Sequence, residues 1–157
     1  MKNQYKKSLT CVYALITAAL LAACSSSLSY NEALQKNVNR IEDSEKLDDA
    51  RFLVDAASYN ILAMRMAEEA IKSGYSASLV ALAKENYEEH EEMGRELKRL
   101  ARKEKIVLPA EVNDAHQKLL AELTSSDRRE FDRTYVRILR DIGQEDRDKF
   151  SQMATAG

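Results

Sequence analysis

The stretch that decides the fold is SEKLDDARFLVDAASYNILAMRMAEEAIKS, residues 44–73. At 100° per residue, its apolar and small side chains gather within about 60° of Phe52, as on one face of a helix. This face carries Phe52, Ala56, Tyr59, Ala63, Met66, Ala67 and Ala70. A second apolar flank carries Leu53, Ala57, Met64 and Ile71. We therefore expect a helix that contacts two neighbours, with Ser44 as its N-cap and Gly74 just past its end.

A second helix is predicted from about Ser76 to Lys105. Its inner stripe comprises Leu79, Ala83, Asn86, His90, Met93, Gly94, Leu97, Leu100 and Ala101. Its last turns are rich in Lys and Arg, which suits the negative end of a helix dipole. A tight turn at residues 73–75 makes the two helices antiparallel.

Two further helices follow, a short one over about residues 110–123 and a long one over about residues 127–153. Their inward sides carry Val112, His116, Leu119, Leu120 and Leu123, and then Phe131, Tyr135, Ile138, Leu139, Ile142, Phe150 and Met153. The three long helices are about 40–45 Å long at 1.5 Å per residue, whereas the short one can only cross or cap them. The prediction is an all-α, up-down bundle of three long helices plus a short crossing helix.

The composition agrees with a single helical domain. The chain has 157 residues but only four Gly and one Pro, too few for the many turns of a β-sandwich or barrel. Its 24 basic and 26 acidic residues give a formal net charge of −2. A near-neutral chain gives no reason to expect a nucleic-acid partner.

The N-terminus has the pattern of a secretory signal peptide. Lys2, Lys6 and Lys7 precede an apolar run over residues 8–23, and no acidic residue occurs before Glu32. The run is about 15 residues long, shorter than the roughly 20 residues of a membrane-spanning helix.

The run ends at Leu21-Ala22-Ala23-Cys24, which resembles the lipobox of bacterial lipoproteins. The resemblance implies cleavage between Ala23 and Cys24, and covalent lipid on Cys24 that anchors the protein to a membrane. Ser25 stands where an inner-membrane retention signal would be Asp, which favours the outer membrane, facing the periplasm. A plain signal peptide, or an uncleaved anchor with an incidental cysteine, is the alternative.

Cleavage divides the chain into three segments. Residues 1–23 are the signal peptide, residues 24–43 the lipidated cysteine with a Ser- and Asn-rich tether, and residues 44–157 the bundle domain. Weak helical spacing at Leu34, Val38 and Ile41 allows one helix within the tether. The mature chain has 134 residues, a net charge of −5 and no thiol besides Cys24, so it forms no internal disulfide.

Residues 47–150 resemble a family of exported bacterial helical proteins, domain of unknown function 4142. The matching motifs are Asp49-Ala50-Arg51-Phe52-Leu53, Glu89-His90, Leu108-Pro109-Ala110-Glu111, His116-Gln117-Lys118-Leu119-Leu120 and Phe131-Asp132-Arg133-Thr134-Tyr135. The resemblance implies a ferritin-like bundle in the cell envelope, and no reaction. This chain lacks the family's Glu near Ala63, has Ile142-Gly143 in place of an acidic-His pair, and stops short of a last long helix.

His90 and His116 are the candidate metal ligands. A ferritin-type di-iron site needs Glu-x-x-His pairs, but Tyr87 and Asn113 stand three residues before these histidines. The alternative is that each is a structural histidine bonded to a neighbouring hydroxyl or carbonyl, such as that of Tyr59 or Tyr135. We expect no metal, no other cofactor and no catalytic residue.

The five carboxylates of Glu85, Glu88, Glu89, Glu91 and Glu92 spread around the outer face of a helix, and are expected to be solvated rather than to bind a cation. No phosphate-binding loop, nucleophile elbow or free thiol indicates an enzyme.

The sequence therefore favours a non-enzymatic envelope lipoprotein with a protein-interaction or structural role. Its expected partners are the membrane, through the lipid, and either a second copy of itself or an envelope protein. A ferritin-like metal-binding protein with a degenerate site, or a truncated family member, remains an alternative.

Overall fold

The structure is a computed structural model that describes residues 27–156, with side chains as far as Gln144. It contains α2 (Tyr30–Val38), α3 (Ser44–Ser73), α4 (Ala77–Glu104), α5 (Asp114–Ser125) and α6 (Phe131–Ala156). The described residues form no strand, so the predicted all-α bundle is confirmed.

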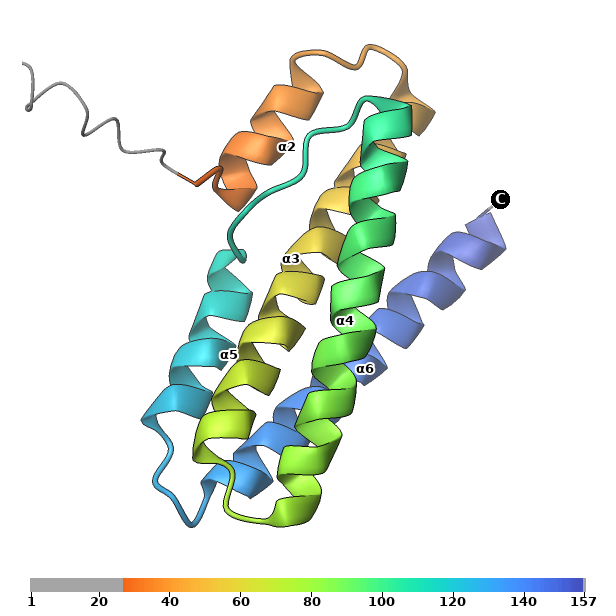
Figure 1. The fold of residues 1–157 in the computed structure, drawn as a ribbon. Helices are drawn as coiled ribbons and strands as arrows, with labels where there is room; N and C mark the ends of the chain where they lie inside the picture. The colour runs from red at the N-terminus through yellow and green to blue at the C-terminus, as the bar shows by residue number, and fades with distance from the viewer. Residues whose placement is uncertain (1–26, 157) are drawn as a thin grey trace, which may run out of the picture.

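The antiparallel pair of α3 and α4 is the centre of the bundle (Figure 1). The N-cap of α3 is Asp43 rather than Ser44, and its carboxylate accepts the Lys46 N–H at 2.8 Å. Ser76 is the N-cap of α4, and its hydroxyl accepts the Leu79 N–H at 3.2 Å. Gly74 ends α3 with a φ of −56°, so a left-handed backbone conformation is not the reason for glycine at this position. A Cβ at Gly74 would lie 2.6 Å from the Ala70 carbonyl oxygen, so this close approach requires glycine.

The two short helices α2 and α5 lie along the same side of α3, one toward each end (Figure 1). The weak helical spacing noted at Leu34 and Val38 corresponds to α2. This helix begins with a capping box of Ser29 and Glu32. The short helix α5 lies along α3 rather than across it. Together the two cover a side of α3 that one long helix would otherwise cover.

The loop between α4 and α5 is held by α2. The Asn37 side chain donates to the Val107 carbonyl and accepts the Val107 N–H, both at 2.8 Å. The Ala110 N–H donates to the Leu28 carbonyl at 2.8 Å. Residues 106–113 form no helix and bend at residues 110–111, and α5 begins at Asp114 with Asn113 as its N-cap, later than predicted.

The core has two parts. The larger lies among α3, α4, α5 and the first half of α6, and the smaller packs Ala50 and Leu53 against Ala101 and Ile106. Four α6 side chains are buried, namely Phe131, Tyr135, Ile138 and Ile142.

The remainder of α6 leaves the bundle, as Figure 1 shows. Residues 127–130, predicted to be helical, form a turn in which Asp127 accepts the N–H groups of Arg129 and Glu130. Phe150 and Met153, predicted to point inward, lie beyond the described side chains.

Candidate functional site

The structure brings both candidate histidines to one residue of α3. The ring of Tyr59 meets His90 of α4 edge-on, with centroids 5.5 Å apart, and His116 of α5 at 6.5 Å. The three aromatic rings come from three helices, and the two histidines share Tyr59 as a neighbour.

His90 is bonded to an amide rather than to a tyrosine hydroxyl. Its Nδ1 lies 3.1 Å from Oδ1 of Asn60, a carbonyl oxygen that can only accept, so Nδ1 carries a proton. Asn60 is buried, and its amide nitrogen faces the Met64 sulfur at 3.8 Å. Burial lowers the pKa of His90, and the nearby Glu89 carboxylate opposes this shift only in part. His90 is therefore neutral in its folded environment at neutral pH.

Gly94 makes room for the Asn60 side chain. A Cβ at Gly94 would lie 2.8 Å from the Asn60 amide nitrogen. Glycine at this position therefore allows the amide to reach His90.

His116 ties the start of α5 to α3. Its Nδ1 lies 2.8 Å from Oγ of Ser58, which is fully buried and also accepts the Asn113 N–H at 2.9 Å. Asn113 in turn accepts the His116 N–H at 2.8 Å as the α5 N-cap. His116 is half-buried. These bonds hold His116 between Ser58 of α3 and the start of α5.

A third polar contact joins α4 to α6. The Asn86 side chain donates to the Tyr135 hydroxyl at 3.2 Å. Tyr135 is fully buried, and this burial raises the pKa of its hydroxyl. Asn86 thus has the inward position predicted for it.

The buried polar side chains form hydrogen bonds with other groups of the protein. Within the described residues, every buried side-chain nitrogen and oxygen has a hydrogen-bond partner. Among these same residues, no three His, Cys, Asp or Glu side chains lie close enough together to hold a metal ion. His90 and His116 each lie within hydrogen-bond distance of a side chain of α3, and both have Tyr59 as a neighbour.

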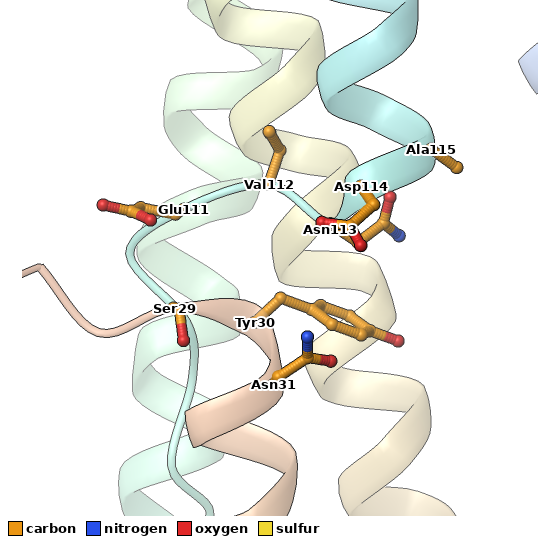
Figure 2. Close-up of a pocket in the computed structure, with 8 residues that line it drawn as sticks. All are labelled: Ser29, Tyr30, Asn31, Glu111, Val112, Asn113, Asp114 and Ala115. Atoms are coloured by element: carbon orange, nitrogen blue, oxygen red, sulfur yellow. The ribbon is translucent and has the colours of Figure 1, made fainter.

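A groove of about 340 Å³ opens where the N-termini of α2 and α5 meet (Figure 2). Figure 2 shows Tyr30 and Asn31 on one side, below Asn113 and Asp114, with Glu111 turned away from them. Tyr30 donates to Asp55, and Ser27 donates to Glu111. Because carboxylates already lie at these positive helix ends, the groove has no unbalanced charge to attract an anion.

An apolar strip on the surface of α4 is the second candidate site. Leu82, Met93 and Leu100 are 40%, 44% and 40% exposed, although the sequence places Met93 and Leu100 on the inner stripe. The three residues are 11 and 7 positions apart, or about three and two helical turns, so they share one edge of the stripe. We call these three residues the α4 strip.

The five glutamates over residues 85–92 are all exposed, as predicted. Cys24 and Ala23, the predicted lipidation and cleavage residues, lie outside the described residues. No helix in the described part of the chain is long and apolar enough to cross a bilayer.

The described residues form a bundle of α-helices whose interior polar side chains are joined by hydrogen bonds. Residues 35–157 match the family described as Domain of unknown function (DUF4142), and the chain belongs to this family. No curated protein and no solved structure matches the chain.

Proposed function

We propose that this protein is a lipid-anchored component of the bacterial cell envelope whose helical body binds another protein and catalyses no reaction. The α4 strip is the observation that carries the proposal. Three large apolar side chains are partly exposed along one edge of a single helix, and exposed apolar side chains that share one face support an interaction site. The described interior, by contrast, uses its polar groups to join helices.

The proposed anchor lies close to the body. Ser27 donates to Glu111, and the Leu28 carbonyl accepts from Ala110, so the chain is already attached to the fold at these residues. Between Cys24 and Ser27 there are three peptide units, which reach about 10 Å when fully extended. A lipid on Cys24 would therefore hold the bundle near the bilayer, and the tether is shorter than the twenty residues expected from the sequence.

Site-specific photo-crosslinking in cells tests the interaction. A photoreactive amino acid placed at Met93 or at Leu100 of the full chain should give an adduct with a second protein chain. The same amino acid at Lys84, an exposed α4 residue on another face, should give none. Adducts at neither strip position, or equal adducts at Lys84, would contradict the proposal.

The arrangement of His90 and His116 around Tyr59 favours one second candidate, a degenerate ferritin-like metal-binding protein. Titration calorimetry with Zn²⁺ tests this function on the purified protein. The candidate predicts binding that His90→Gln abolishes. Absence of binding, or the same binding in His90→Gln, would end it.

A further inference from the structure

We infer that the partner of the α4 strip is a second copy of this chain, whose α6 lies against the strip. The inference rests on the proposed function, in which the strip binds a protein, and names that protein. It follows from the charges that border the strip and from those on the outer face of α6.

The α4 strip has one apolar and one acidic border. On one side it adjoins the residues that pack on α3, such as Leu79 and Ala83. On the other side, at 100° per residue, a column of exposed carboxylates follows it. This column consists of Glu85, Glu89, Glu92 and Glu96, of which Glu92 and Glu96 pair with Arg95 and Arg99 of the same helix. A helix that fits here needs an exposed apolar residue among cations.

The outer face of α6 has this composition. Val136 is 52% exposed, the most of any large aliphatic side chain in the described part of the chain. Arg133 and Arg140 stand three positions before and four after it, so all three share one face. Their side chains are 80% and 70% exposed. Each arginine has a local partner, Glu130 at 2.9 Å and Asp141 at 3.1 Å, but exposed pairs of this kind contribute little and exchange readily.

The charges select one pairing among three. Two α4 strips facing each other would bring two columns of glutamates together, and two α6 outer faces would bring arginines together. Only α4 against α6 sets opposite charges side by side around apolar side chains. In a two-fold dimer each such contact occurs twice, because both copies use the same surfaces.

Charge reversal on full-length chains with two different affinity tags tests the inference. One variant carries Glu85→Lys and Glu89→Lys on α4, and the other carries Arg133→Glu and Arg140→Glu on α6. After extraction with mild detergent, one wild-type copy should capture the other. For each variant, the amount of one tagged copy that the other tagged copy captures should fall at least about tenfold, because the contacts between two copies of the same variant become like-charged. The α4 variant and the α6 variant mixed together should capture each other, since their reversed charges are again opposite.

Three results would overturn the inference: no capture between wild-type copies, undiminished self-capture by either variant, or no recovery in the mixture. Thermal unfolding of each variant, compared with wild type, shows whether it folds. If a variant does not fold, the milder substitutions Glu85→Gln and Arg133→Gln replace it. These remove a charge without reversing it, so capture between copies of each variant should fall below that of wild type. A photo-crosslink from Leu100 to a chain of another mass would refute the second copy while leaving the proposed function intact.

Discussion

At the scale of single residues, Asn37 is the clearest link between α2 and the rest of the fold. Its side chain is buried and matches both polar groups of the Val107 backbone. Replacement by Ala leaves these two groups without partners, so Asn37→Ala should lower the free energy of unfolding by about 2–4 kcal/mol. Urea unfolding measures this change. The exposed Asn31→Ala is the control and should change stability by less than about 0.5 kcal/mol. Equal changes in the free energy of unfolding for Asn37→Ala and Asn31→Ala would show that the hydrogen bonds between Asn37 and Val107 contribute nothing to stability.

Asp132 connects the start of α6 to the start of α4. Its carboxylate accepts the N–H of Tyr75 at 2.8 Å and that of Ser76 at 3.0 Å. Burial alone would raise the pKa of Asp132, but the hydrogen bonds from Ser76 and Tyr75 outweigh it and lower the pKa. Because the unfolded chain holds the proton more tightly, the contribution of Asp132 is present above about pH 4 and is lost as the pH falls below it.

Asp132→Asn should therefore destabilise the protein by about 1–2 kcal/mol at neutral pH, and by less as the pH approaches about 3. Unfolding measured across this range tests the prediction, with the exposed Asp48→Asn as control. A difference from wild type that stays constant with pH would refute it.

His90 is expected to make the stability of the protein depend on pH in a higher pH range than Asp132 does. Because burial lowers its pKa below the ordinary value of 6.5, the unfolded chain takes up the proton first as the pH falls. Stability from neutral His90 should be lost below about pH 6.5. The groups facing His90 are Asn60 and Tyr59, which are neutral, and Glu89 of α4, which limits the shift.

In His90→Gln the side chain stays neutral at every pH. The stability advantage of wild type over His90→Gln should thus shrink between about pH 7.5 and pH 5.5. Chemical unfolding at both pH values measures it. An advantage that grows toward acid would contradict the assignment of His90 as a buried neutral imidazole.

The residue types of the polar interior could be predicted, but their partners could not. Apolar periodicity placed His90 and Asn86 on the inward side of α4, where they lie. The partners Asn60 and Ser58 are on the helix face between the two predicted apolar flanks, and helical periodicity does not say which residue of another helix comes opposite.

At the scale of helices, the sequence predicted α3 over its observed residues and α4 to within one residue at each end. Both are long, periodic and bounded by capping residues, which are the strongest local signals. The starts of α5 and α6 were both placed four residues too early. Contacts with α2 hold the segment before α5, and the Asp127 side chain accepts hydrogen bonds within the turn before α6, so tertiary and turn contacts override local helix propensity there.

Alanine substitutions at two glycines within helices are predicted to have different effects on stability. A Cβ at Gly143 would meet nothing within 4 Å, so Gly143→Ala should stabilise α6 by up to about 1 kcal/mol. A Cβ at Gly94 would displace the Asn60 amide and its bond to His90, so Gly94→Ala should be less stable than Gly143→Ala by about 1–3 kcal/mol. Thermal unfolding of both variants decides the order. The reverse order would show that Gly94 is not needed for the approach of Asn60.

At the scale of the whole molecule, the sequence predicted a bundle short of one long helix. The structure shows how the side of α3 is nevertheless covered, since α2 and α5 share it (Figure 1). The exposure of the α4 strip could not be predicted, because it depends on which neighbouring helices cover this edge of α4. A helical wheel gives the face of a helix and not the path of its neighbour.

The proposed lipid anchor on Cys24 would decide where the α4 strip can meet a partner. Intact-mass spectrometry of the protein extracted from bacterial membranes tests it most directly, with Cys11→Ala as the matched control for Cys24→Ala. We predict that wild type and Cys11→Ala begin at Cys24 and carry the added mass of acyl chains, and that Cys24→Ala carries none. A wild-type chain without acyl mass, or a Cys24→Ala chain with it, would contradict the account.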